Sequence, residues 1–248
     1  MESDIDCTIC LVVDSIRHGS RFLDSLFRTA DPVSLEVIVV NPGPENELDF
    51  LKKEFPGVVI YENNIRETMA RTRNRVFRSA KGRYLSFWRD EIVFLPDCLF
   101  RLIDFLDDNP AVGIVGPALE TITEQPLISS AAFPDLFSWL RAGTSLVAGG
   151  TEPSAAGQFE VDWLSGAALV INPNLVDEIG IFDQSFPCCE EIDYCFRARK
   201  AGWHIHLVPS ARAVYRYPVL KQPDWTWSGE LFAGLRFLQK KWFTALKK

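Results

Sequence analysis

The sequence lacks an excess of basic residues. Its 248 residues include 26 Lys and Arg against 33 Asp and Glu, which gives a formal net charge of −7. Because nucleic-acid binding needs a broad basic footprint, we expect no nucleic-acid partner, and an anionic ligand must be held by a local basic patch. Hydrophobic residues make up 47% of the chain, which is enough for a sizeable core and excludes a disordered protein.

Long apolar runs and a secretion signal are also lacking. No stretch approaches the ~18 consecutive apolar residues of a membrane span. The first residues, MESDIDCTIC, carry acids where a signal peptide has a basic region. We therefore expect a cytoplasmic protein, either free or peripheral at the inner face of a membrane.

The six cysteines lack the paired spacing of a zinc site. Cys7 and Cys10 lie in an apolar, strand-like run, where side chains are expected in the core. Further along the chain, cysteines and histidines again show no paired C-x-x-C motif. These residues are Cys188, Cys189, Cys195, His204 and His206. Reduced, structural cysteines are the interpretation we favour.

Apolar runs alternate with amphipathic segments through the first 117 residues. The predicted strands are 7–13, 35–40, 58–61, 83–88 and 111–116, and the predicted helices are 20–27, 47–55, 67–80 and 96–107. This pattern indicates an α/β fold, a Rossmann-like single domain whose mostly parallel central sheet is flanked by helices. Ligands bind beyond the carboxyl ends of such strands, which makes Asn41 and Asp90 candidate contacts.

The rest of the chain is less regular. Residues 118–160 are rich in Ser, Ala, Gly, Thr and Pro and predict a variable loop or lid. Residues 161–171 form a strand-like run interrupted by Gly166, and the later elements are expected at 173–179, 190–201, 204–208 and 213–215. We expect one domain over residues 1–220, with a nucleotide-binding half (1–117) and an acceptor-side half (161–220). Residues 221–248 predict an amphipathic helix that either packs on the domain or lies on an anionic membrane surface.

Asp90 follows the apolar strand RYLSFW, within the triplet Arg89-Asp90-Glu91. A carboxylate at the end of a buried strand is suited to Mg²⁺ or Mn²⁺, which needs one or two protein carboxylates and takes its other ligands from phosphate and water. A polar turn is the alternative interpretation.

A basic stretch stands out in this acidic protein. Residues 66–83 contain seven Lys and Arg residues and one acid, Glu67. Arginine suits pyrophosphate because its planar fork donates two hydrogen bonds. A solvated basic helix face is the alternative.

Three carboxylates gather at the start of a predicted helix. Glu190, Glu191 and Asp193 lie within four residues, at the positive end of the helix dipole. Such a cluster offers a general base. An acidic cap on a surface helix is the alternative.

The order of these motifs resembles that of a known family. The most specific stretches are VDWLSGAALVI, IGIFDQSF, CCEEIDYCFRARKAGW and HLVPSARAVY, preceded by ARTRNRVFRSAKGRYLSF and PAVGIVGPAL. Over about residues 6–215 they resemble the family 2 glycosyltransferases with the GT-A fold, in particular the rhamnosyltransferase-like branch.

The resemblance implies an inverting transfer of a sugar from a nucleotide diphosphate-sugar to an acceptor hydroxyl, in bacterial surface polysaccharide or glycolipid synthesis. The acceptor would be a glycan or a lipid-linked molecule, and the cofactor a divalent cation, Mg²⁺ or Mn²⁺, held by Asp90. Glu191 would be the general base, with Asp193 as the second candidate. The donor-binding residues would be Asn41, Asn64, Arg66, Arg73, Asn74 and Asp90, and the acceptor-binding residues Trp163, Gly166 and Glu190.

Four positions depart from the family pattern. Asn41 and Glu191 stand in place of aspartates, Arg66 in place of a glycine and Tyr215 in place of a histidine. They motivate an alternative function, a degenerate member that binds a nucleotide, glycan or protein without turnover. A nucleotidyltransferase would need a glycine-rich phosphate loop after the first strand, where this chain has one glycine, Gly19.

Overall fold

The computed structural model describes residues 4–41, 43, 48–136, 159–216 and 227–245. Strands and helices alternate through the first half in the predicted order, with shifted ends. The elements are β1 (Cys7–Val12), α1 (Ile16–Thr29), β2 (Leu35–Val40), α2 (Asp49–Glu54), β3 (Val59–Tyr61), α3 (Met69–Phe77), β4 (Tyr84–Arg89), β5 (Ile92–Phe94), α4 (Cys98–Asp108), β6 (Val112–Glu120), β7 (Pro126–Leu127), β8 (Ser130–Ala131), β9 (Phe159–Glu160), β10 (Trp163–Leu164), β11 (Ala168–Ile171), α6 (Pro173–Ile179), α7 (Glu190–Lys200), β12 (His204–Tyr215) and α8 (Trp227–Ala245).

One large sheet runs through the molecule, with the strand order β3-β2-β1-β4-β11-β6-β12-β5 along its main path. The pairs β1–β2, β1–β4, β2–β3 and β6–β12 are parallel. β11 and β5 run antiparallel to their neighbours. The predicted mostly parallel sheet is confirmed, whereas β5 was missed because three residues are too few to show a period.

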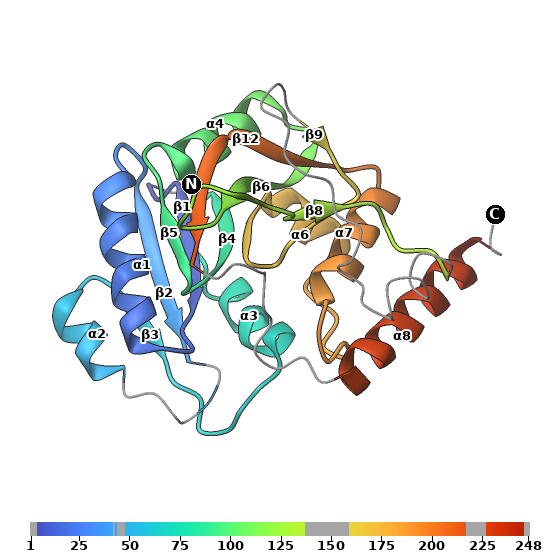
Figure 1. Ribbon diagram of the computed structural model, residues 1–248, viewed down its shortest axis with the longest axis horizontal. Coiled ribbons are helices and arrows are strands. Elements are labelled where there is room, and N and C mark those ends of the chain that lie inside the picture. The colour runs from blue at the N-terminus through green and yellow to red at the C-terminus, as the bar shows by residue number, and fades with distance from the viewer. Residues whose placement is uncertain (1–3, 42, 44–47, 137–158, 217–226, 246–248) are drawn as a thin grey trace.

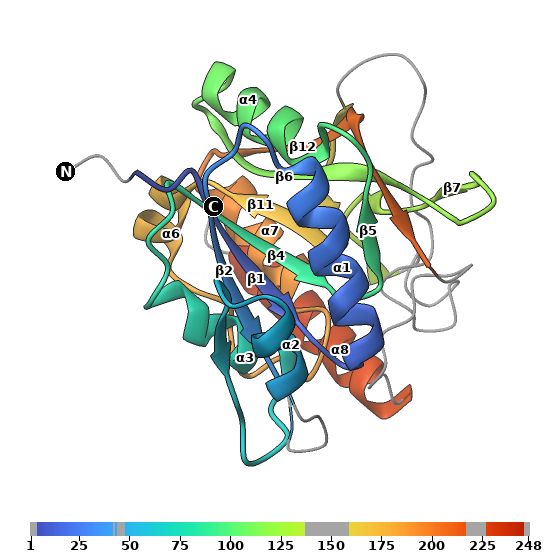
Figure 2. The ribbon, with the colours of Figure 1, turned by 90° about the vertical axis from the view of Figure 1, so that its left-hand side faces the viewer.

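Helices cover both faces of this sheet (Figure 1, Figure 2). Helices α1, α2 and α4 share one core with the sheet, and α3, α6, α7 and α8 share the other. The residues of β1 belong alternately to the two cores. Ile9 and Leu11 contribute to the first core, and Cys10 and Val12 contribute to the second. Side chains alternate along a strand, so a strand covered on both faces is apolar at every position.

The cysteines belong to these cores, as predicted. All six are free and buried. Burial raises the pKa of the Cys7 and Cys10 thiols to about 12, so both stay protonated at neutral pH.

The interruption at Gly166 separates two strands with different partners. β10 pairs with β8 in a small second sheet, and β11 enters the main sheet between β4 and β6. The predicted runs 204–208 and 213–215 prove to be one strand, β12, whose register shifts between Val208 and Arg212. Pro209 lies within this irregularity, and its missing N–H explains the break in the ladder.

The predicted C-terminal helix is present as α8. Ala233 and Phe237 are fully buried, so this helix packs on the domain, while Phe232 and Leu235 are each 53% exposed. No helix in the described part of the chain is long and apolar enough to cross a membrane. Residues 137–158 of the predicted lid, and 221–226 and 246–248 of the predicted C-terminal segment, lie outside the described residues.

Candidate active site

Asp90 lies in the turn after β4, at the N-terminus of α1. Its side chain is 1% exposed, and its Oδ2 accepts hydrogen bonds from the backbone N–H groups of Asp14 (2.9 Å) and Ser15 (2.8 Å). A helix N-terminus favours an anion at this position. The other oxygen, Oδ1, is buried and has no hydrogen-bond partner among the described residues.

This environment shifts the proton affinity of Asp90. Burial, and then the charge of Glu91, raise the pKa of Asp90 to about 8, although the Ser15 N–H favours the ionised form. The carboxyl therefore holds a proton at neutral pH.

Glu91, the neighbouring carboxylate, is already paired. Arg89 Nε and Nη2 each lie 2.9 Å from one of its two oxygens, and both side chains are buried. Burial lowers the pKa of Arg89, but the charge and hydrogen bonds of Glu91, together with the charges of Tyr215 and Asp14, raise this pKa above its ordinary value. Arg89 Nη2 also lies 3.4 Å from Asp14 Oδ2. Asp90, not Glu91, is thus the carboxylate of this turn with an oxygen left for an external cation.

The start of β11 joins this turn to helix α7. Arg89 N donates to the Ala167 carbonyl at 3.0 Å, next to the Ala168–Trp88 register pair. A Cβ added to Gly166 would lie 3.1 Å from Glu191 Cδ. Residues 166–168 therefore hold the turn of Asp90 close to the first turn of α7.

Arg73 of α3 contacts the same segment from the face of the sheet that α3 and α7 cover. Its Nη1 lies 2.9 Å from Glu190 Oε1, and its Nη2 donates to the Gly166 carbonyl. Burial raises the pKa of Glu190 to about 7; Arg73 opposes this rise and Glu191 adds to it. These buried contacts connect α3 to the segment before β11 and to α7. Arg73 therefore holds these parts of the site together, and its guanidinium does not face a donor.

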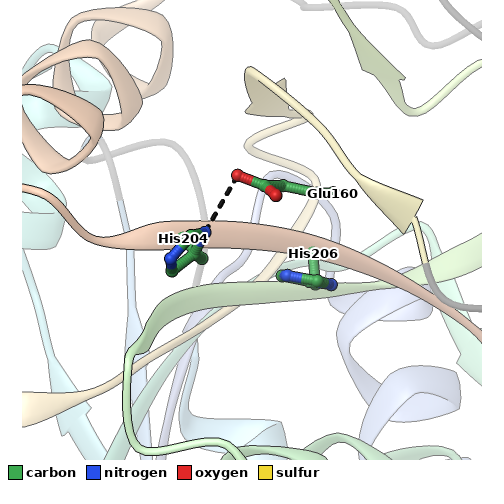
Figure 3. Close-up of side chains that lie close together, drawn as sticks. All are labelled: Glu160, His204 and His206. Atoms are coloured by element: carbon green, nitrogen blue, oxygen red, sulfur yellow. Dashed lines mark hydrogen bonds and ion pairs between the residues drawn. The ribbon is translucent and has the colours of Figure 1, made fainter.

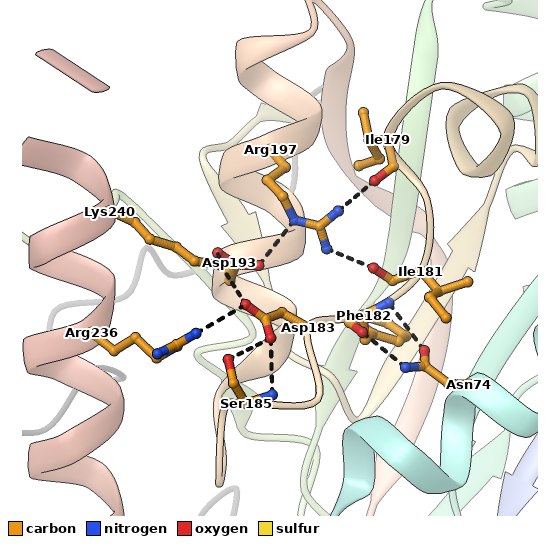
Figure 4. Close-up of polar contacts among 10 residues, drawn as sticks. All are labelled: Asn74, Ile179, Ile181, Phe182, Asp183, Ser185, Asp193, Arg197, Arg236 and Lys240. Carbon is orange, nitrogen blue, oxygen red and sulfur yellow. Dashed lines mark hydrogen bonds and ion pairs between the residues drawn. The ribbon is translucent and has the colours of Figure 1, made fainter. Parts of the chain in front are cut away.

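Asn74 also has a structural role. Its Nδ2 donates to the Phe182 carbonyl at 2.8 Å, and its Oδ1 accepts from Phe182 N at 3.0 Å (Figure 4). The side chain thus holds the loop that leads into α7, and it was predicted to contact the donor.

The two candidate bases separate at α7. Glu191 is buried beside Gly166. Asp193 faces α8, where its Oδ1 accepts from Lys240 at 2.7 Å and its Oδ2 from Arg197 at 3.0 Å (Figure 4). Of the two, Glu191 lies against Gly166, next to the Ala167 carbonyl that accepts from Arg89 N, and this position favours Glu191 as the candidate base. Cys189, directly before the helix, has φ 59°, a strained backbone that is common at functional sites.

The predicted donor contacts near β2 lie together. Asn41 is buried at the end of β2 and its Oδ1 accepts from Gly43 N at 3.0 Å. A Cβ on Gly43 would lie 3.5 Å from Arg66 Cβ, and Arg66 and Asn64 are exposed. Sequence reasoning missed Asn63, which is buried with neither amide atom bonded to a described residue. Its position two residues after the predicted strand 58–61 was the available signal.

Trp163, a predicted acceptor contact, is buried. Its Nε1 donates to the Ala132 carbonyl at 3.1 Å, and the ring packs in the core shared with α7. The structure therefore brings Gly166 and Glu190 to the site but gives Trp163 no open face for a sugar.

Gly166 provides a test of this packing. In Gly166→Ala the new Cβ would lie 2.9 Å from Arg73 Nη1, and Arg73 cannot swing away because it is buried and bonded on both sides. We expect the free energy of unfolding to fall by about 1–3 kcal/mol, the usual cost of overpacking. Urea unfolding measures this. Gly57→Ala is the matched control, since no atom lies within 4 Å of its Cβ; equal losses in the two variants would contradict the close contact.

Comparisons with known proteins identify the family and the fold. The model of the family described as Glycosyl transferase family 2 matches residues 20–151, more than half of the chain. A curated relative, the N-acetylglucosaminyl-diphospho-decaprenol L-rhamnosyltransferase of Mycobacterium tuberculosis, is 25% identical over 227 residues. That match covers 80% of this chain and 71% of the relative, and it recurs in a second strain.

Two solved structures share the fold. GalNAc-T7 with UDP, GalNAc and Mn²⁺ gives a TM-score of 0.71 at 13% identity, over 87% of this chain and 44% of that one. The mannosyltransferase PcManGT of Pyrobaculum calidifontis, in complex with GDP-Man and Mn²⁺, gives 0.60 at 16% identity, over 88% and 59%. This chain therefore spans less than two thirds of either structure. The sheet, the motifs and the family model lead to one conclusion: the chain belongs to glycosyl transferase family 2 and has the GT-A fold.

Proposed function

We propose that the chain transfers a sugar from a nucleoside diphosphate-sugar to an acceptor hydroxyl with inversion at the anomeric carbon. One arrangement carries the proposal. Asp90 directly follows Arg89, whose N–H is bonded to Ala167, and Glu191 lies against Gly166. The buried acid Asp90 and the candidate base Glu191 thus lie on either side of residues 166–167. Donor activation and acceptor deprotonation require two such groups close together.

A divalent cation fits beside Asp90. The observation that supports it is the buried Oδ1 without a described partner, since Mg²⁺ and Mn²⁺ prefer carboxylate oxygens. When bound, such an ion neutralises the charge that develops on the departing nucleoside diphosphate. Both solved structures named above contain Mn²⁺.

Further positive charge lies near this turn, outside the basic stretch that the sequence suggested. Arg216 N donates to the Glu91 carbonyl at 3.2 Å, at the end of β12. The charge of Arg216, together with burial and Arg17, lowers the pKa of Arg21 on α1. None of these three arginines has an ion-pair partner in the described ranges. We propose that they attract the diphosphate of the donor, which relieves their mutual repulsion.

We propose a lipid-linked glycan of the bacterial cell surface as the acceptor and a deoxyhexose or hexose as the transferred sugar. The mycobacterial relative, an N-acetylglucosaminyl-diphospho-decaprenol L-rhamnosyltransferase, supports this choice. Residues 1–117 would bind the donor and residues 161–220 the acceptor, under residues 118–160.

The test is donor turnover by the purified chain. We expect it to release nucleoside diphosphate from one member of a panel of nucleotide sugars with Mn²⁺ or Mg²⁺, and to invert the anomeric configuration when a lipid-linked acceptor is added. Nuclear magnetic resonance of the product shows the configuration. A panel without turnover or binding would overturn the proposal.

A binding protein without turnover is the second candidate. The observation in its favour is that Arg73 and Asn74 are buried in structural contacts. Calorimetry with nucleoside diphosphates separates the two: metal-dependent binding supports the transferase, and metal-independent binding without turnover supports the second candidate.

We also propose that α8 contacts an anionic membrane surface. Its exposed Phe232 and Leu235 lie near a pocket of about 450 Å³ between α7 and α8, whose lining includes the basic residues Arg197, Lys200, Arg236 and Lys240. Apolar side chains beside a basic lining are typical of a helix at a lipid interface. Replacing both apolar residues with serine is expected to cost about 2 kcal/mol of vesicle binding, or roughly 30-fold.

Sedimentation with vesicles of phosphatidylglycerol and of phosphatidylcholine measures this effect. Phe50→Ser is the matched control, because Phe50 is an exposed aromatic residue on α2, across the sheet from α8. Equal binding of the wild type and the double variant would rule out the membrane contact.

A further inference from the structure

Two histidines and a glutamate meet at the end of β12 that is remote from Asp90. His204 and His206 are two residues apart on β12, so both point to the same face of the strand. Glu160 of β9 is the antiparallel register partner of His206. Figure 3 shows the carboxylate of Glu160 beside the strand that carries both imidazoles. One ligand atom from each of the three residues lies within 4.8 Å of the others.

We propose that Glu160, His204 and His206 form a binding site for a divalent transition-metal ion such as Zn²⁺. Two imidazoles and one carboxylate are a ligand set that suits Zn²⁺ and neighbouring first-row ions, whereas Mg²⁺ and Ca²⁺ prefer oxygen alone. Three protein ligands leave the remaining positions to solvent. Around a tetrahedral zinc with bonds near 2.0 Å the ligand atoms lie about 3.3 Å apart, so the atoms that are farthest apart need to close by up to about 1.5 Å.

The site is accessible and partly preformed. The side chains of His204 and Glu160 are 47% and 42% exposed, so an ion can reach them from solvent. His206 is held by Phe105 of α4, with ring centroids 5.3 Å apart. Its Nδ1 is buried without a hydrogen-bond partner among the described residues. An imidazole fixed by packing loses less freedom when it binds an ion.

Two interactions compete with the ion. His204 Nδ1 lies 2.9 Å from Glu160 Oε1, and Arg199 forms an ion pair with the same oxygen. When the ion binds, His204 and Glu160 would both coordinate it and would no longer contact each other directly. The positive charge of Arg199 repels a cation, so Arg199 lowers the affinity of the site for the metal ion.

The site is separate from the candidate active site. Tyr215, at the other end of β12, pairs in register with Ile92 beside Asp90 and Glu91. The register partners of β12 on β6 run from Val112 to Glu120, eight residue steps, so at about 3.3 Å per residue the two ends of β12 lie on the order of 25 Å apart. Binding would join β9 to β12 and, through Arg199, reach the end of α7, whose first turn carries Glu191. We therefore assign the ion a structural role, in fixing the segment that leads into β10 and Gly166.

The experiment is calorimetry of the full chain with ZnCl₂ after removal of metal by a chelator. We expect one saturable site, weakened at least about 10-fold in His204→Ala and in Glu160→Gln. Arg199→Gln should bind Zn²⁺ more tightly than the wild type, an outcome that a merely structural role of Arg199 would not give. With Zn²⁺ at about 100 times Kd, the Tm should rise by about 5 °C or more.

Two variants serve as controls. His18→Ala removes the remaining histidine, and Asp90→Asn removes the carboxylate proposed for the donor metal; both should keep the Zn²⁺ affinity. Glu160 is at an exposed position, so Glu160→Gln keeps the test valid if His206→Ala fails to fold. Absence of saturable binding, or unchanged affinity in both His204→Ala and Glu160→Gln, would overturn the proposal.

Discussion

Replacing Glu191 by glutamine is expected to lower kcat by about 10²- to 10⁴-fold, the range that a general base contributes. Glutamine keeps the size of the side chain, so the packing against Gly166 is retained while the proton acceptor is lost. Donor affinity should stay within a few-fold of the wild type, because the role that we propose for Glu191 is to deprotonate the acceptor. Steady-state kinetics with a saturating donor, and calorimetry with the nucleoside diphosphate, measure the two effects separately.

The neighbouring acids are the controls. Asp193→Asn should lower stability, since it weakens contacts with Lys240 and Arg197, and the variant that stays folded should keep most of its kcat. Glu190 is the competing base because its pKa, raised to about 7, is suited to proton transfer at neutral pH. If Glu190→Gln abolished turnover while Glu191→Gln kept it, the base would be Glu190 and our assignment would be wrong.

Replacing Asp90 by asparagine is expected to weaken metal-dependent donor binding by at least about 100-fold. Loss of a residue that only orients a metal ligand costs up to about 100-fold in affinity, and loss of a ligand itself should cost no less. The amide preserves the shape of the side chain, but it removes the charge that attracts a divalent cation. Calorimetry with nucleoside diphosphate and Mn²⁺, with and without a chelator, measures this loss. Asp104→Asn, on the exposed side of α4, is the control and should bind as the wild type does.

The same substitution has the opposite effect on stability when no metal is present. Because the folded pKa of Asp90 is raised from 3.8 to about 8, the protonated carboxyl favours the folded state. That contribution is complete below pH 4 and is lost as the pH rises through about 8. Between pH 6 and pH 8 the wild type should lose about 2 kcal/mol of unfolding free energy that Asp90→Asn retains.

Urea unfolding of both proteins at the two pH values, in the presence of a chelator, checks this result. Other titrating groups, such as Glu190, are common to the two proteins and cancel in the difference. If the wild type and the variant showed the same change between pH 6 and pH 8, Asp90 would titrate below this range and would already be ionised at neutral pH.

Much of the fold was readable because it depends on local periodicity. β2 was predicted at its observed bounds, since LEVIVV is apolar except at Glu36 and is followed by the turn-forming sequence Asn41-Pro42-Gly43-Pro44. α6 was predicted equally well because Asn172 caps its start and Gly180 ends it. β5 and the continuity of β12 were not predicted, because a strand of three residues and a strand that contains Pro209 both lack a clear alternation.

The sequence identified which residues belong to the candidate site, but it did not predict what each of them contacts. Strand ends and helix starts identified Asp90 and the Glu190–Asp193 cluster. Sequence could not tell that Arg89 would bind both oxygens of Glu91, or that Lys240, 47 residues beyond Asp193, would bind that carboxylate. Such pairings join separate elements, and a one-dimensional pattern carries no information on which charges will face each other.

By itself the sequence determined the order of the elements, the two-sided core and the family. Those properties follow from which residues avoid water, and burial depends on spacing along the chain. Only the tertiary structure decided that Asp90 Oδ1 is buried without a hydrogen-bond partner among the described residues, that Glu191 and not Asp193 lies at Gly166, and that Glu160 lies beside His204 and His206. The physical reason is that charge and hydrogen-bond satisfaction depend on distances of about 3 Å between atoms far apart in sequence.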